Sequence, residues 1–506
     1  MCVFKDSTRQ RRELALAVVA VQVAAVVVLM IDFVMHASAF RADIAVPVFR
    51  FHDEVYRIVF GRESFKEIKL VHSPFIWLHR KGRDYNNAGV NFASSKNFVM
   101  TVCRYVGMTA TRLKGIIPKI FEQPRDAKEI LLRISAIADK ELIPGKTLIF
   151  FDEVQECPEI VTAIKFLVDE GSYNYVMSGS LLGVELKDIR SVPVGYMAVK
   201  EMFPLDFEEF CEAVGMSVNV MSHLHECYDK DMPVDNFVHA KMLDLLRLYL
   251  VVGGMPSVVM KYLQTNNMKI VRDEQLEIIN TYRMDIAKYD PENKLYIKDI
   301  FDMIPSELNA KNKRFILKSL NENAKFDRYR NSFLWLVDAG VALPTYNVEE
   351  PRKPLKLAEQ RNLFKLFSND IGLLASQYAT GFQLQIITGQ INLNYGAIFE
   401  NFAAQQLKAN GFNLNYFNSK KQGELDFVIE HEGKVVPIEI KSGKDYKRHN
   451  ALCNVLENSE YEIETAIVFS SRNVERDGKI RYLPIYMLMF LQPSVMTDSV
   501  FKFQPI

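Results

Sequence analysis

Residues 147–155 read TLIFFDEVQ, an apolar run that ends in two adjacent acids. A short apolar run of this kind is typical of a buried strand. In open α/β sheets, ligands gather at the carboxyl ends of the parallel strands. We therefore expect Asp152 to hold a magnesium ion and Glu153 to polarise the attacking water in phosphoryl transfer. The alternative is a strand that merely ends in two solvated acids.

The neighbouring segments predict a parallel α/β core around this strand. Residues 127–142 and 158–170 have the periodicity of amphipathic helices, and residues 173–178 read as a second strand. Strands that alternate with helices of this length form parallel βαβ units. The second strand leads into Ser178 and Ser180, whose hydroxyls we expect beside the acidic pair, where they would sense a nucleotide γ-phosphate.

Four motifs that occur in order carry a resemblance to a known family. They are DEVQECP (152–158), SGSLLG (178–183), FPLDFEEF (203–210) and VVGGMP (251–256). From about residue 115 onward the chain resembles prokaryotic AAA-type ATPases that carry a C-terminal domain of unknown function. The resemblance implies a P-loop NTPase-like parallel sheet with ATP and Mg²⁺ as its cofactors.

Such a family should carry a phosphate loop, G-x-x-x-x-G-K followed by Ser or Thr, whose backbone N–H groups bind phosphates. No such loop is recognisable, although the acidic strand supplies a Walker B motif. The triplet at residues 145–147 reads GKT, but it enters the acidic strand instead of leaving a strand for a helix. Lys140 stands where the first glycine is required.

A weaker match places the missing loop near the N-terminus. Residues 55–71 resemble the helix and strand that follow a phosphate loop in this family, but residues 47–55 contain neither glycine nor lysine. The chain is therefore either a degenerate ATPase or a sequence whose reading frame is disturbed over parts of residues 1–113. As written, we expect it to hydrolyse ATP poorly or not at all.

Composition indicates which binding partners and which cellular compartment to expect. The 62 basic residues balance the 62 acidic ones, so no net field steers the chain to nucleic acid or to a membrane. Six scattered cysteines fit a reducing cytosol, and we expect a cytoplasmic protein. Residues 14–31, LALAVVAVQVAAVVVLMI, reach the lower length limit for a membrane-spanning helix, which leaves membrane anchoring as the alternative.

The order of the expected elements divides the chain into four regions. We expect an α/β protein with an apolar N-terminal segment (1–40), an AAA-type ATPase domain (41–235), a helical winged-helix domain (236–380) and a small α/β restriction-endonuclease-like domain (381–506).

The middle region contains a basic stretch. Residues 306–348 read as helix, turn and helix and resemble a winged helix. A helix that approaches DNA phosphates needs basic side chains, and the stretch supplies them. The candidates are Lys313, Arg314, Lys318, Lys325, Arg328 and Arg330. The alternative is a solvated charged face on a packing module.

The C-terminal region carries a pattern of acids and a lysine. Asp426 in ELDF, followed by Glu439 and Lys441 in EIK, has the spacing of the PD-(D/E)XK nuclease fold. Alternation along a strand puts Glu439 and Lys441 on one face. We expect Asp426 and Glu439 to bind a divalent cation and Lys441 to orient or activate water. Glu400, on a helix, could complete the oxygen cage that magnesium prefers. The alternative is an ordinary ion pair on a strand.

Two functions stay open at this point. The first is an ATP-binding, DNA-associated protein whose tail is a metal-dependent nuclease. The second is a non-catalytic nucleotide-dependent switch or interaction protein, in which both acidic sites have become structural. ATP, DNA and further copies of the chain are the expected partners.

Overall fold

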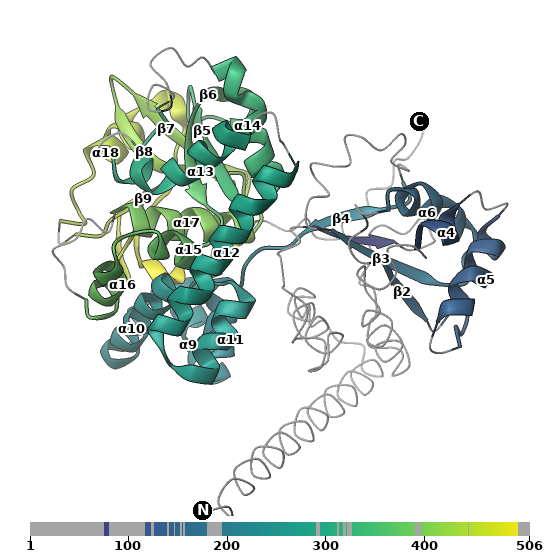
Figure 1. Cartoon of the computed structure of the whole chain (residues 1–506). Coiled ribbons are helices and arrows are strands. Elements are labelled where there is room, and N and C mark those ends of the chain that lie inside the picture. Colours follow the sequence, from purple (N-terminus) through teal and green to yellow (C-terminus); the bar gives the residue numbers. More distant parts are fainter. Residues whose placement is uncertain are drawn as a thin grey trace, which may run out of the picture. The chain divides into compact units, whose positions relative to one another are not determined.

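The chain forms two compact units, each of which is described by itself. The computed structural model describes residues 75–79, 117–122, 126–138, 141–145, 147–151, 154, 157–179, 195–289, 294–310, 313–316, 320, 326–389, 396–443 and 445–493. Unit 1 takes in Trp77–Ser178 and Ile189–Val199, and unit 2 consists chiefly of Lys200–Ile506. Figure 1 labels the helices and strands of both units. The expected apolar segment at 14–31 lies outside the described residues.

Unit 1 contains the predicted acid-tipped strand. A four-stranded sheet has the order β2-β3-β1-β4. Strands β2 and β3 pair in parallel, from Leu148 opposite Asn174 to Phe151 opposite Met177. The strands are β1 (Phe75–His79), β2 (Leu148–Phe151), β3 (Asn174–Gly179) and β4 (Ala198–Glu201), and the helices are α4 (Ile117–Phe121), α5 (Ala127–Ile137) and α6 (Glu159–Glu170). The predicted parallel βαβ unit is therefore confirmed as β2–α6–β3.

Local sequence explains why these helices begin and end where they do. The Asp126 side chain accepts the Glu129 N–H at 2.9 Å and caps the first turn of α5. Helix α6 ends at Gly171, whose φ of 81° is a left-handed conformation that glycine adopts without strain. The apolar stripe of α6, which includes Ile160, Ile164 and Leu167, is buried. Burial of this stripe fixes which face of the helix points inward.

Unit 2 is rich in helices from its start. Its helices of six residues or more are α8 (Phe207–Ala213), α9 (Val218–Asp229), α10 (Asn236–Val252), α11 (Pro256–Thr265), α12 (Met268–Tyr289), α13 (Lys294–Asn309), α14 (Phe326–Asp338), α15 (Ile371–Ser376), α16 (Thr380–Ile387), α17 (Gly396–Ala409) and α18 (Asn450–Glu457), with a 3₁₀ helix η10 (Ile485–Phe490). Within the described ranges, no single helix is long and apolar enough to cross a membrane. Helices α10 and α11, which are bent by 118° at their junction, have the length and composition of a membrane span only when they are taken as a pair.

An eight-stranded mixed sheet forms the framework of unit 2, in the order β11-β12-β10-β9-β8-β7-β5-β6. Strand β8 runs antiparallel to both β7 and β9, whereas β10 runs parallel to both β9 and β12. The strands are β5 (Ala342–Val348), β6 (Glu359–Ser368), β7 (Asn415–Ser419), β8 (Gly423–His431), β9 (Lys434–Ile440), β10 (Ala466–Ser470), β11 (Glu475–Asp477) and β12 (Ile480–Pro484).

This sheet joins two regions that we expected to be separate domains. Strand β5 pairs in parallel with β7, with Tyr346 opposite Asn415, and in antiparallel fashion with β6. The boundary expected at residue 381 therefore falls inside one compact unit. The pairing joins residues about 70 positions apart, and such contacts leave no periodic signal in the local sequence.

The same pairing bears on the winged-helix expectation. Helices α13 and α14 and strand β5 do follow one another, but β5 is an interior strand of the eight-stranded sheet, flanked by β6 and β7. Strand β6 is the last strand of the sheet, so β5 and β6 form an antiparallel pair at its edge, after α13 and α14 in the chain. The winged helix expected in this stretch stays a prediction.

Two of the family-like motifs meet at the start of unit 2. The Leu205 N–H donates to the Gly254 carbonyl at 2.8 Å, and the Gly254 N–H donates to the buried Asp370 carboxylate at 2.6 Å. A Cβ on Gly254 would lie 2.0 Å from the Leu205 carbonyl oxygen. The two motifs, at residues 203–210 and 251–256, therefore pack backbone against backbone, and this close approach requires glycine at position 254.

Candidate functional site

The nucleotide-binding candidates follow the parallel strands of unit 1. Strands β2 and β3 end at the same edge of the sheet, and Asp152 and Glu153 come directly after β2. Asp152, Glu153, Ser180 and the expected loop at 47–55 lie outside the described residues, and Ser178 is described only as part of the β3 backbone. The roles of these residues in binding ATP and Mg²⁺ stay predictions.

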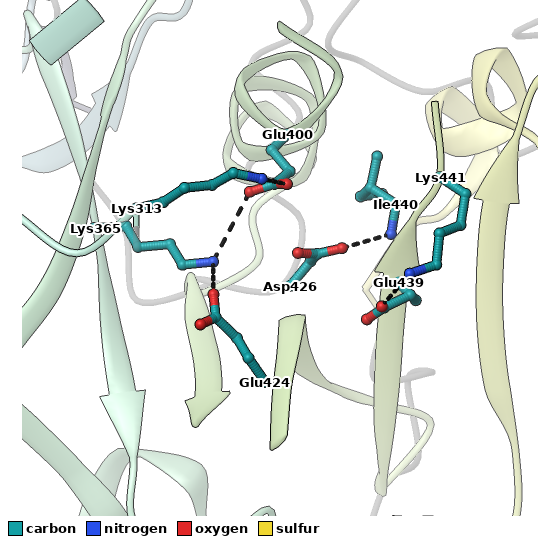
Figure 2. Close-up of polar contacts among 8 residues, drawn as sticks. All are labelled: Lys313, Lys365, Glu400, Glu424, Asp426, Glu439, Ile440 and Lys441. Atoms are coloured by element: carbon teal, nitrogen blue, oxygen red, sulfur yellow. Dashed lines mark hydrogen bonds and ion pairs between the residues drawn. The ribbon is translucent and has the colours of Figure 1, made fainter. Parts of the chain in front are cut away.

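Unit 2 brings the acidic candidates together from three elements, as Figure 2 shows. Glu400 lies on α17, Asp426 on β8 and Glu439 near the end of β9, and Lys441 follows β9 directly. Strands β8 and β9 are antiparallel neighbours, with Phe427 opposite Ile438. The sheet therefore sets Asp426 beside the carboxyl end of β9.

Two short contacts hold the predicted motif residues in place. The Lys441 ammonium lies 2.6 Å from Glu439 Oε1, so the two side chains do share one face. The Ile440 backbone N–H donates to Asp426 Oδ2 at 2.8 Å. Asp426 is thus tied to the strand that carries Glu439, and the expected proximity of Asp426, Glu439 and Lys441 is observed.

Two further lysines enter the site from sequence-distant positions. Lys365 on β6 is 0% exposed, and its Nζ lies 2.7 Å from Glu424 Oε1 and 3.8 Å from Glu400 Oε2. Its Nζ also lies 4.9 Å from the centre of the Tyr416 ring. Lys313 forms an ion pair with Glu400 Oε1. Glu400 is therefore engaged by two ammonium groups (Figure 2).

Burial and mutual repulsion shift the protonation of the acids. The pKa of Glu439 is raised to about 8, chiefly by burial and next by the nearby Asp426 charge, against the opposing effect of Lys441. Burial likewise raises the pKa of Glu400 to about 7, with Asp426 as the next cause. The Asp426 carboxylate therefore lies close enough to disfavour the charged forms of both glutamates.

The pKa of Lys365 moves the opposite way from that of an isolated buried lysine. Burial lowers the pKa of Lys365, but the charges of Glu400, Glu424 and Asp426 together raise it above its ordinary value. Lys365 is therefore a charged ammonium inside the protein at physiological pH.

The acidic side chains offer some, but not all, of the ligands of a divalent cation. Glu400 Oε2 and Glu439 Oε2 are buried acceptors without a hydrogen-bond partner, and spare carboxylate oxygens are the ligands that Mg²⁺ and Ca²⁺ take. Across the described ranges, however, no group of three or more His, Cys, Asp or Glu residues is arranged to hold a metal ion. The expected three-carboxylate cage is thus not formed with the side chains as they stand, because the two lysines bind Glu400. The metal-binding roles of Glu400, Asp426 and Glu439 stay predictions.

The expected DNA-binding residues are described only in part. Lys313 is held by Glu400 and so does not reach outward to a phosphate. Arg330 is exposed on α14, and Arg314 lies next to Lys313 in the segment 313–316. Lys318 and Lys325 lie outside the described residues, and Arg328 is described only as part of the α14 backbone. DNA contact by these residues stays a prediction.

Sequence reasoning missed Lys365 and Glu424. The one signal for Lys365 was its position in NLFKLFS (362–368), where a lysine interrupts an otherwise apolar strand. A lysine is almost never fully buried unless it is paired, so a lysine in such a strand indicates a buried acidic partner. Nothing local indicates which acid that partner is.

The β2–α6–β3 unit, with an acid pair after β2 in the sequence, is compatible with a P-loop type of nucleotide-binding fold. Comparison with protein-family models agrees, since residues 108–211 match an AAA domain. This match implies a P-loop ATPase fold and nucleotide binding, typically with Mg²⁺. Two more models follow along the chain, a domain of unknown function (DUF8612) at residues 243–384 and a second one (DUF4143) at residues 395–488. No curated protein matches the chain.

The two matches in unit 2 divide the acidic site between them. Lys313 and Lys365 lie in the region matched to the first domain of unknown function, whereas Glu400, Asp426 and Glu439 lie in the region matched to the second. The eight-stranded sheet joins these regions through β5 and β7. The site is therefore assembled from both matched regions.

Proposed function

We propose that the chain is an ATP-binding, DNA-associated cytoplasmic protein whose second unit carries a metal-dependent, nuclease-like site. One observation carries this proposal. Asp426 and Glu439 lie on paired strands with Lys441 2.6 Å from Glu439, and Glu439 keeps a buried oxygen that accepts no hydrogen bond. A buried acceptor without a donor is costly unless a cation or a donor is bound there during function.

Each residue has a role that its contacts support. Asp426 and Glu439 would hold the divalent cation, which would supply charge neutralisation at a phosphodiester and a more acidic water. The Lys441 ammonium would orient the attacking water and stabilise negative charge that develops on the phosphate. The Ile440 N–H keeps Asp426 aimed at the end of β9. In unit 1, Asp152 and Glu153 would serve Mg²⁺ and water at a bound nucleotide, and Ser178 and Ser180 would sense its γ-phosphate.

Cleavage of labelled DNA by the full chain tests the proposal. We expect Mn²⁺- or Mg²⁺-dependent cleavage of duplex or single-stranded DNA, reduced at least about 100-fold by Asp426→Asn or Glu439→Gln, because each removes a charged ligand. Glu464→Gln is the matched control, since Glu464 forms an exposed ion pair with Lys434. Absence of cleavage with either metal, in a protein that is folded by circular dichroism, would refute the nuclease role.

A second candidate function is a non-catalytic nucleotide-dependent switch. It is favoured by the two lysines that occupy Glu400, since ion-paired acids of this kind also serve as structural networks. This candidate predicts ATP and DNA binding without cleavage, and DNA affinity that changes with nucleotide. Equilibrium binding to fluorescent DNA with and without ATP measures this, and affinity that is independent of nucleotide would contradict it.

A further inference from the structure

Lys365 is buried in the acidic cluster, out of contact with solvent. Its side chain is 0% exposed, and its ammonium is bound at 2.7 Å by Glu424 Oε1. Glu424 is held in turn by Asn418, whose Nδ2 donates to Glu424 Oε2 at 2.6 Å. The Tyr416 ring lies on the same ammonium, at 4.9 Å from its centre. A buried ammonium with this set of partners stays where it is, because leaving them would expose a charge to an apolar interior.

The lysines are distributed unevenly over the cluster. Glu400 Oε2 lies 3.8 Å from Lys365 Nζ, and Glu400 Oε1 is bound by Lys313. Glu439 binds Lys441 through Oε1 only, and its Oε2 has no hydrogen-bond partner. Asp426 accepts a backbone N–H. The Glu400 side is therefore supplied with positive charge, whereas the side of Asp426 and Glu439 keeps a free acceptor (Figure 2).

The charges of the cluster nearly cancel. It contains three ammonium groups and four carboxylates, namely Lys313, Lys365 and Lys441 with Glu400, Glu424, Asp426 and Glu439. With all groups ionised, the difference is a single negative charge. Enzymes that cleave phosphodiesters with two metal ions place those ions about 3.5 to 4 Å apart and need acids to balance both. One excess negative charge suits one divalent cation and not two.

We propose that Lys365, supported by Lys313, is a built-in cation that occupies the Glu400 side of the cluster and restricts it to a single divalent cation, held by Asp426 and Glu439. This inference rests on the cation site of the proposed function and states how many divalent cations that site binds. Lys365 is a positioning residue in this account, because it acts on the cation through Glu400 and Glu424.

The eight-stranded sheet brings both lysines to the cluster. Lys365 belongs to β6 and Lys313 to the segment 313–316, whose Phe315 N–H donates to the Phe364 carbonyl of β6 at 2.9 Å. Both lysines thus reach the cluster because β6 belongs to the same sheet as β8 and β9. The middle region of the chain supplies the positive charges that the C-terminal acids lack.

A titration of the full chain with Mn²⁺ in the absence of nucleotide tests the inference. The electron paramagnetic resonance signal of free Mn²⁺ reports how many ions are bound. We expect one bound Mn²⁺ that Asp426→Asn abolishes, and this difference separates it from any ion in unit 1. Lys365→Met removes the charge and keeps the chain length. It should add a second Asp426- or Glu400-dependent Mn²⁺ and tighten binding about tenfold, because a neighbouring positive charge is lost. Lys365→Arg, which keeps the charge, should bind one Mn²⁺.

Two controls keep the outcome interpretable. Lys230→Met removes a lysine that pairs with Glu226 on the surface of unit 2, and it should leave Mn²⁺ binding unchanged. Lys313 is 22% exposed, so Lys313→Met should fold even if Lys365→Met does not, and it should also tighten Mn²⁺ binding. A single Mn²⁺ of wild-type affinity in both variants would overturn the inference and leave the proposed function standing. No Asp426-dependent Mn²⁺ in the wild type would overturn both.

Discussion

The raised pKa values of two buried glutamates connect single residues to the stability of unit 2. Glu439 and Glu400 have folded-state pKa values of about 8 and about 7, against 4.5 in the ordinary case. The folded protein therefore keeps protons that the unfolded chain releases above about pH 4.5. The contribution of these groups to stability is present at low pH and is lost as the pH rises through the folded pKa values.

This protonation predicts a pH dependence for the metal-free protein. The free energy of unfolding of unit 2 should fall between about pH 5 and pH 8. Glu439→Gln, which cannot ionise, should lower the slope by up to about 1.4 kcal/mol per pH unit, the value for one proton. Urea titrations in EDTA measure the free energy of unfolding at each pH. The fluorescence of the buried Trp335 reports the unfolding of unit 2 in a Trp77→Phe background, which removes the other tryptophan.

Glu464→Gln provides the comparison for that measurement. Lys434 holds the pKa of the exposed Glu464 below its usual value, so Glu464 titrates outside the window. The slope between pH 5 and pH 8 should therefore be unchanged in this control. A slope in Glu439→Gln equal to that of the wild type would show that Glu439 is not a proton-binding group in the folded state.

Individual elements depend on backbone packing as much as on side chains. The turn between α10 and α11 packs closely on its neighbours because Gly254, against Leu205, and Gly253, against Asp370 and Gly372, have no Cβ. Asp370 caps α15 through the Leu373 N–H at 2.8 Å and also accepts the Gly254 N–H, so one carboxylate ties two helix ends together. A motif that read as a family signature is thus a packing requirement of three elements.

Gly254→Ala should therefore destabilise unit 2 strongly. The new Cβ would lie 2.0 Å from a backbone oxygen, which cannot rotate away as a side chain can. Overpacking of this kind costs about 1 to 3 kcal/mol or more. Gly381→Ala is the matched control, because nothing lies within 4 Å of a Cβ there. Denaturant unfolding measures both changes, and equal stability of the two variants would contradict the proposed packing.

At the scale of the whole molecule, unit 2 is one compact unit despite its two matched sequence regions. The β5–β7 pairing and the ion pairs of Lys365 cross the boundary between these regions. A fragment cut at residue 381 would lose β5 and β6 from the sheet and leave Glu400 and Glu424 without Lys365. Buried acids that lose their partner are destabilised by about 3 to 5 kcal/mol.

We therefore expect residues 200–506 to unfold in one cooperative transition and residues 381–506 alone not to fold. Circular dichroism melts and the dispersion of amide proton resonances distinguish a folded fragment from an unfolded one. Mixing 200–380 with 381–506 should restore part of the structure, because the two pieces contain complementary strands. A stable, cooperative fold of 381–506 by itself would show that the C-terminal region is an independent domain.

The sequence by itself determined the features that depend on neighbours along the chain. The β2–α6–β3 unit was predicted because strand and helix periods and the strand–helix alternation are local signals. Glu439 and Lys441 were predicted on one face because side chains alternate along a strand. The AAA-type core followed from motifs in order, and the AAA-domain match agrees with it.

Only the tertiary structure decided which distant residues meet. Sequence patterns placed Lys313 among DNA-binding residues and did not single out Lys365, whereas the folded chain puts both lysines on Glu400. The sheet also joined β5 and β6 to the C-terminal strands across the boundary expected at residue 381. The physical reason is the same in each case. Burial of charge and pairing of strands select partners by free energy over the whole fold, and such partners leave no period in the sequence between them.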